Sequence, residues 1–212
     1  MEKSGGFAEK AYQIIKADIT NGKLRPGELL VESRFSKQIH ISRTPVRAAL
    51  QRLVCEGLAQ TDANKSVRVT NVTEEDIEQI TQVRRELETL AVRLFRDRAP
   101  PEKIAGLRAL CQRECALVSA PSIDYLALID VDYQLHTALA EMTGNRFLWE
   151  TMKRIKTSSN RFLILSGTME KYGALGVKEH DEFVSFLEKG RFDYAELAIR
   201  NHVVKIGERI LI

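Results

Sequence analysis

The sequence predicts a mainly α-helical protein in two parts: a small N-terminal unit that ends in a β-hairpin, and a larger helical bundle. Apolar residues recur at helical spacing over most of the 212 residues, whereas strand-like runs occur only at residues 58–61 and 67–70. Positive charge gathers at one end, because residues 1–71 contain 12 Lys and Arg against 7 Asp and Glu. We therefore expect a basic domain at residues 1–71 and a helical domain at residues 72–212.

Three helices are expected before the hairpin. Apolar spacing predicts the first over residues 8–21 and the second near residues 31–39. A tight corner at His40-Ile41 separates the second helix from the third, and the turn at residues 62–66 joins the two strand-like runs. Three helices with a tight corner between the last two, followed by a hairpin, describe a winged helix-turn-helix.

The third helix carries the clearest functional pattern. Thr44 is a good N-cap, Pro45 suits the first helical turn, and Gly57 is well placed to end the helix. Side chains at its N-terminus, including Arg43 and Arg47, can donate hydrogen bonds to phosphates and to base edges. Taken alone, the segment could equally be an amphipathic helix with a solvated basic face. The corner before it and the hairpin after it favour DNA binding.

Two N-terminal motifs resemble those of the DNA-binding domain of the GntR family. They are Pro26-Gly27-x-x-Leu30-x-Glu32 and Ser42-Arg43-Thr44-Pro45-Val46-Arg47-x-Ala49-Leu50. The resemblance implies that the start of the third helix contacts operator DNA and that the hairpin tip reaches the minor groove. With two further basic residues, the expected DNA contacts are Arg34, Ser42, Arg43, Thr44, Arg47 and Lys65.

The chain departs from that family pattern at three positions. His40 occupies a corner where glycine is usual, and His enters the left-handed conformation less readily than Gly. Ala48 stands where a glutamate is usual, which removes a negative charge beside the DNA. Ser66 replaces the usual glycine of the hairpin tip, which leaves that backbone less freedom to approach DNA.

Residues 72–212 read as helical throughout, with breaks at proline and glycine positions and no strand pattern. The loops are short, which implies antiparallel neighbours in a compact bundle. Six helices are expected near residues 74–98, 102–118, 122–142, 146–165, 175–189 and 193–210.

Three of the four histidines lie on inward faces of this bundle. Asp132 and His136 are four residues apart on one helix face, and His180 and His202 lie on the apolar stripes of two other helices. Burying these groups separately would be costly, whereas one divalent metal ion satisfies all four. Such donors suit Zn²⁺, Ni²⁺ or Mn²⁺. The alternative is a set of separate core histidines with local hydrogen bonds; for the set, we favour the metal.

The bundle motifs resemble the all-helical FCD effector-binding domain of FadR-type GntR regulators. They are Asp132-x-x-x-His136, Gly144-Asn145, Glu179-His180 and Asn201-His202. The resemblance implies that this Asp and the three His form a metal site beneath a ligand pocket. The six-helix count is similar to the shorter, VanR-like form of the class.

Arg84 is the first candidate for binding an effector. It lies on an apolar stripe, and a buried guanidinium needs a carboxylate, from a ligand or from the protein. The FCD resemblance suggests a ligand carboxylate, and the alternative is an internal salt bridge to Glu88 or Asp132. Arg161 is a weaker candidate. A ligand held by both metal and Arg would suit a small hydroxy acid or sugar acid.

Compartment and class follow from what the sequence lacks. No apolar run approaches the roughly 18 residues that span a bilayer, and no secretory signal is evident. Cys55, Cys111 and Cys115 are an odd number without metal-knuckle spacing, which favours a reducing cytoplasm. Cys111 and Cys115 share a helix face and are predicted to be small core residues.

The sequence thus predicts a cytoplasmic, homodimeric transcription regulator, by default a repressor. Two winged helices would read a palindromic DNA operator, and a small organic acid near the metal would change DNA affinity through a linker at residues 71–73. A second hypothesis makes the metal itself the signal. A third makes the bundle a metal-dependent enzyme, which is disfavoured because no general base or nucleophile is evident beyond the metal ligands.

Overall fold

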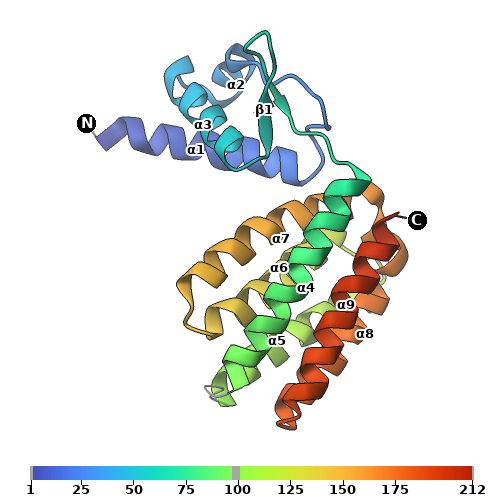
Figure 1. Ribbon diagram of the computed structural model, residues 1–212. Coiled ribbons are helices and arrows are strands. Elements are labelled where there is room, and N and C mark those ends of the chain that lie inside the picture. The colour runs from blue at the N-terminus through green and yellow to red at the C-terminus, as the bar shows by residue number, and fades with distance from the viewer. Residues whose placement is uncertain (1, 97–100, 212) are drawn as a thin grey trace. The chain divides into compact units, whose positions relative to one another are not determined.

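The computed structural model describes residues 2–96 and 101–211, in which it places nine helices and one two-stranded sheet (Figure 1). The chain divides into two compact units, Met1–Val72 and Thr73–Ile212. Each unit buries its own apolar core. The mainly helical fold class expected from the apolar periodicity is confirmed.

The N-terminal unit contains α1 (Glu2–Thr20), α2 (Glu32–Ile39), α3 (Arg43–Cys55) and the antiparallel strands β1 (Ala59–Thr61) and β2 (Val67–Val69). The strands pair with Ala59 opposite Val69 and Thr61 opposite Val67. One apolar cluster holds the three helices and the hairpin together, and its members with no exposed surface include Ile15, Ile19, Phe35, Val46 and Leu53. This is the winged helix-turn-helix that the sequence predicts.

The corner before α3 shows how the sequence sets the angle of that helix. His40 adopts the left-handed conformation (φ 59°, ψ 45°), and its N–H donates to the Ser36 carbonyl to end α2. The N-cap of α3 is Ser42, so the expectation that Thr44 caps the helix was wrong. Pro45 therefore lies in the third helical position, where its missing N–H removes one donor that a capping side chain would use. The Ser42 side chain makes no capping hydrogen bond.

The hairpin tip is built around Asp62. Its Oδ1 accepts hydrogen bonds from the backbone N–H groups of Asn64 and Ser66, each at 2.9 Å. The residue with positive φ is Lys65 (60°) rather than Ser66. The exposed Lys65 side chain thus occupies the tip of the wing.

The second unit is a bundle of six helices, as expected. In Figure 1, α4 and α9 lie side by side, and α8 packs along α9. Short connections separate most of them, and the described bounds are α4 (Glu74–Arg96), α5 (Pro101–Val118), α6 (Tyr125–Met142), α7 (Arg146–Ser166), α8 (Thr168–Glu188) and α9 (Phe192–Leu211).

The structure corrects two helix starts and leaves one helix end undescribed. α8 begins at Thr168 rather than near residue 175, because only Gly167 (φ 67°) breaks the chain there. Gly173 lies inside the helix, where a Cβ would come within 3.2 Å of a Leu128 methyl group. α6 begins at Tyr125 rather than near residue 122, since Asp124 caps it. The expected end at residue 98 of the first bundle helix lies outside the described residues.

Two further observations bear on the expectations from composition. Cys111 is buried but Cys115 is exposed, so the prediction that both are core residues was wrong for Cys115. Within the described parts of the chain, no helix is both long and apolar enough to cross a membrane.

The closest approach of α4 and α9 depends on Gly207. A Cβ there would lie 2.6 Å from Thr81 Oγ1 and 3.2 Å from Thr81 Cβ, which no side-chain rotation can move away. We expect Gly207→Ala to lower the free energy of unfolding by about 1–3 kcal/mol, because the two helices must separate. Gly106→Ala is the control, since the added methyl meets only Met142 Cε at 3.9 Å. Denaturant unfolding that finds both variants equally stable would contradict this packing.

Candidate metal centre and nucleic-acid interface

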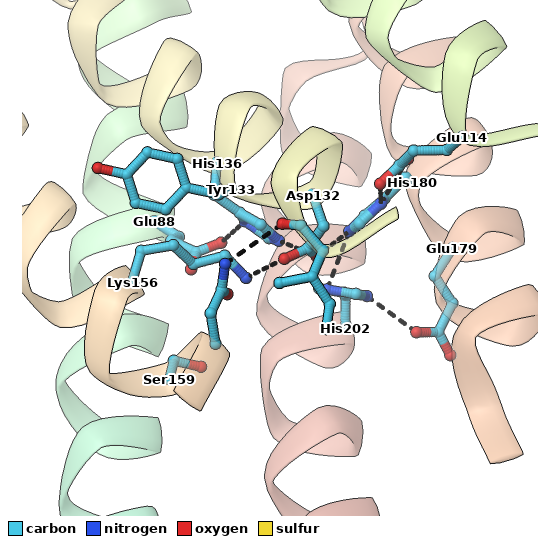
Figure 2. Close-up of polar contacts among 12 residues, drawn as sticks. Glu88, Glu114, Asp132, Tyr133, His136, Lys156, Ser159, Glu179, His180 and His202 are labelled. Atoms are coloured by element: carbon cyan, nitrogen blue, oxygen red, sulfur yellow. Dashed lines mark hydrogen bonds and ion pairs between the residues drawn. The ribbon is translucent and has the colours of Figure 1, made fainter. Parts of the chain in front are cut away.

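Four side chains of the bundle converge at one buried point. Asp132 and His136 come from α6, His180 from α8 and His202 from α9, and one ligand atom of each lies within 4.8 Å of all the others. Figure 2 shows the three imidazoles and the carboxylate pointing toward one another. The four predicted metal ligands are thus brought together by the fold, from three helices.

Each imidazole is also fixed from behind by a carboxylate on a different helix. A carboxylate can only accept here, so each histidine donates its Nδ1 proton outward. The partners are largely or fully buried, and they come from α4, α5 and α8. The pairs are His136 with Glu88 at 2.6 Å, His180 with Glu114 at 2.9 Å, and His202 with Glu179 at 2.9 Å (Figure 2).

This pairing leaves the Nε2 atoms facing the centre. His180 Nε2 and His202 Nε2 are 3.0 Å apart, and His136 Nε2 lies 3.4 Å from Asp132 Oδ1 and makes no hydrogen bond. With both Nδ1 protons committed to carboxylates, the two facing Nε2 lone pairs repel unless a proton or a metal ion lies between them. A histidine whose Nδ1–H is held by a carboxylate is the usual ligand of a metal ion. The donor set therefore fits a divalent metal.

The protonation states of His202 and Asp132 suit metal ligation, and that of His180 opposes it. Burial, helped by the neighbouring His180, lowers the pKa of His202 to about 3, so its imidazole is neutral near pH 7. Burial alone would raise the pKa of Asp132, but the Lys156 ammonium and His136 hold it well below its usual value. For His180, burial would lower the pKa, yet the Glu114 carboxylate raises it by stabilising the imidazolium, so a metal ion that binds here must displace the proton of Nε2.

Lys156 is a centre residue that the sequence analysis missed. Its side chain is 1% exposed, and its ammonium nitrogen lies 2.5 Å from Asp132 Oδ2 (Figure 2). Burial and the nearby Arg84 guanidinium lower the pKa of Lys156. The signal was available, because Met152, Lys156, Ser159 and Leu163 form one inward stripe of α7 at helical spacing. The lysine holds one oxygen of Asp132 and leaves the other turned toward the histidines.

Arg84 and Arg161 are both buried, and for Arg84 this confirms what its place on an apolar stripe predicts. Arg84 Nη2 lies 2.8 Å from Glu88 Oε1, and its Nη1 donates to Ser159 Oγ at 2.8 Å. This is the internal salt bridge that the sequence left open as an alternative. Burial lowers the pKa of Arg161, and the charge that opposes this effect is Asp76. Their roles in effector binding stay predictions.

A small cavity of about 10 Å³ adjoins the metal centre. That volume holds about one water molecule and is too small for an organic acid. Neither Arg84 nor Arg161 lines it. Its walls come from α5, α6, α8 and α9, and they include Glu114, Asp132, Tyr172, Gly176, His180 and His202.

The six expected DNA contacts are all exposed on the winged unit. Four of them occupy the N-cap and the first turns of α3, one lies on α2 and one at the hairpin tip. Two of the arginines have carboxylate partners that sequence reasoning did not foresee. Arg47 donates to Glu32 from Nε at 2.7 Å and from Nη2 at 2.9 Å, and Arg34 donates to Glu28 from Nη1 at 2.9 Å.

Comparison with known families assigns both units. Residues 7–69 match the model of bacterial regulatory proteins of the gntR family, and residues 79–205 match the FCD domain. The chain belongs to the GntR family and carries an FCD domain. It is therefore a DNA-binding transcription regulator, as the motif resemblance implied, and its two matched regions lie within the two structural units.

Relatives of this GntR regulator are transcription regulators rather than enzymes. The Nta operon transcriptional regulator of Aminobacter aminovorans is 30% identical over 189 residues, covering 88% of this chain and 86% of the relative. The transcriptional repressor RspR of Escherichia coli is 24% identical over 203 residues, covering 95% and 88%. The enzyme hypothesis is thereby set aside.

Solved structures show the same fold over the whole chain. A GntR transcriptional regulator from Rhodococcus sp. RHA1 superposes with a TM-score of 0.83 at 22% identity, covering 96% of this chain and 97% of that one. McbR/YncC of Escherichia coli gives a TM-score of 0.76 at 20% identity, covering 97% and 95%. At these identities the likeness concerns the fold alone.

Glu114 allows the role of the outer carboxylates to be tested. We expect Glu114→Gln to weaken zinc binding by about 10- to 100-fold, because the amide oxygen accepts the Nδ1–H bond without the negative charge that makes His180 a more basic ligand. Glu102→Gln, an exposed change on the same helix, should bind as wild type does. Competition titration against a chromogenic chelator measures both. Equal affinity in the two variants would show that the carboxylate is not needed to orient the ligand.

Proposed function

We propose that this GntR regulator is a homodimeric, metal-dependent DNA-binding protein whose operator affinity responds to a small carboxylate. The metal ion would be held by Asp132, His136, His180 and His202. The observation that carries the proposal is the convergence of three Nε2 atoms and one carboxylate oxygen at a buried point. Their outer atoms are already paired, so a cation at the centre completes the set.

The donor chemistry supports a transition-metal ion. Three imidazole nitrogens and one carboxylate oxygen suit Zn²⁺, Ni²⁺ or Mn²⁺, whereas Ca²⁺ and Mg²⁺ prefer oxygen ligands. Such an ion, when bound, supplies a positive charge and a coordination position for an anionic oxygen. Lys156 keeps Asp132 ionised and positioned, which reserves one carboxylate oxygen for the ion.

The winged unit supports reading of a two-fold symmetric operator. One recognition helix covers only a few base pairs, so a regulator of this kind needs two copies to reach specific affinity. The exposed start of α3 and the exposed Lys65 at the hairpin tip suit contacts in two grooves. We infer a palindromic operator and a homodimer, and repression as the default sign of regulation.

The cavity beside the metal centre sets a condition on the effector. Its volume of about 10 Å³ admits a water molecule, so an organic acid needs the wall of the cavity to move. Gly176 lies in that wall, on α8. If an acid can bind only after a helix has shifted, it stabilises one of two arrangements of the bundle. An effector that favours one arrangement can thereby change operator affinity. A ligand carboxylate at Arg84 would replace its contacts with Glu88 and Ser159.

The small cavity also favours a second candidate, in which the metal ion itself is the signal. The centre accommodates an ion without any enlargement, whereas an organic ligand needs more room. Under this alternative the ion alone controls operator affinity, and no organic acid changes it further.

A thermal-shift screen of small hydroxy and sugar acids, with zinc or with a chelator, separates these candidates. We expect zinc to raise the Tm of the wild type, because an ion that binds only the folded state stabilises it. An acid that binds the metal should raise the Tm further. At an acid concentration of about 100 times its Kd, the free energy of unfolding rises by roughly 2.7 kcal/mol. The control is His180→Ala combined with His202→Ala, which should lose both responses.

Three results would change the proposal. An acid that stabilises the double variant, or the chelated wild type, as much as the zinc-bound wild type binds away from the metal. A zinc response with no acid response across the screen supports the metal as the signal. No zinc response in the wild type would refute the metal centre.

A further inference from the structure

The recognition helix holds one arginine in an unusual way. Arg47 on α3 forms two hydrogen bonds with Glu32, the first residue of α2, at 2.7 and 2.9 Å. The two side chains are 62% and 28% exposed, so Arg47 faces solvent while Glu32 is partly enclosed. Both the hydrogen bonds and the opposite charge of Arg47 lower the pKa of Glu32, so the pair is ionised at neutral pH.

The geometry of the guanidinium decides what remains available. Arginine has five N–H donors in a planar fork. Glu32 takes its side edge, formed by Nε and Nη2, and leaves the end edge formed by Nη1 and Nη2. That end edge is the one that donates two parallel hydrogen bonds to O6 and N7 of guanine in the major groove. One guanidinium can therefore bind Glu32 and a guanine at the same time.

The charge of the pair points to the same use. Because Glu32 neutralises Arg47, the pair contributes little net attraction to phosphates, which is what non-specific binding depends on. The Arg47–Glu32 pair instead fixes the orientation of the Arg47 guanidinium. A free arginine side chain has many rotamers, and fixing it before binding removes part of the entropic cost of the complex.

The second arginine pair on this surface differs in this respect. Arg34 donates to Glu28 through Nη1 alone, so one hydrogen bond rather than two holds its guanidinium. Glu28 also accepts from the backbone N–H of Arg25. Arg34 is thus held less firmly than Arg47, and we expect it to contact a phosphate rather than a base. The Arg34–Glu28 pair provides a matched comparison within the same unit.

We propose that Glu32 is a positioning residue that makes Arg47 a guanine reader. It holds the side edge of Arg47 and directs the end edge into the major groove, so it sets base preference without touching DNA itself. This inference rests on DNA binding by α3 and is independent of the metal and of any effector. The opposing possibility is that Glu32 merely competes with DNA for Arg47.

The test compares duplexes selected from a random-sequence pool by the full-length protein. Arg47→Ala should abolish the preference for guanine at one position in each half-site, which identifies the base pair that Arg47 reads. At that position, Glu32→Gln should reduce the discrimination between guanine and other bases by about three- to tenfold. Binding to unrelated DNA should strengthen and become more salt-dependent by about one phosphate contact, since a negative charge is lost.

Two controls keep the outcome interpretable. Glu28→Gln should leave guanine discrimination unchanged while removing a charge from the same surface. In an Arg47→Lys background, Glu32→Gln should have no further effect on discrimination, because lysine has no second edge. Discrimination is a ratio of two affinities of one protein, so a partly unfolded variant does not alter it.

The inference fails if Glu32→Gln binds all duplexes more tightly and keeps the full guanine preference, because Glu32 is then only a competitor. It also fails if Arg47→Ala loses no base preference at any position. An equal loss of discrimination in Glu28→Gln and Glu32→Gln would assign the effect to surface charge rather than to the held guanidinium.

Discussion

The constraint on which the bundle depends is that a dry interior must satisfy every polar group it encloses. Three imidazoles, their carboxylate partners, Lys156 and Arg84 are packed where water has almost no room. The Nδ1 atom of each histidine is satisfied by the protein, because a carboxylate accepts its proton. The Nε2 atoms are not satisfied in this way, since they face one another and one carboxylate oxygen. That imbalance is what makes the centre a metal site in our account.

The same centre links the helices of the bundle to one another. The converging ligands come from α6, α8 and α9, and the paired carboxylates come from α4, α5 and α8. An ion at this point therefore fixes the spacing of five helices. Gly207 allows close approach of α4 and α9, where a Cβ would meet Thr81, so small shifts there meet hard contacts rather than empty space. A bundle built this way has few intermediate arrangements, which suits a two-state response to a ligand.

Sequence reasoning recovered most of the fold and the inner part of the site. Helical spacing placed Asp132, His136, His180 and His202 on inward stripes, and the corner and hairpin identified the wing. It missed the outer partners because Glu114 pairs with a histidine 66 residues away, and periodicity says nothing of which faces meet. It also placed the start of α8 too late, because Gly173 does not break the chain but lies inside the helix and packs close to Leu128. Pro45 after Thr44 suggested a later start for α3, whereas any first-turn position tolerates proline.

The central claim is that the ion in the bundle and the DNA on the winged unit affect one another's binding. It is tested most directly by measuring operator affinity at a series of free zinc concentrations, for the wild type and for His180→Ala combined with His202→Ala. We expect the wild-type operator affinity to change by about 5- to 150-fold as the centre fills with zinc, and the double variant to bind DNA with no zinc response. The claim would be contradicted if the wild type bound the operator equally tightly when its centre is filled with zinc and when a chelator has emptied it.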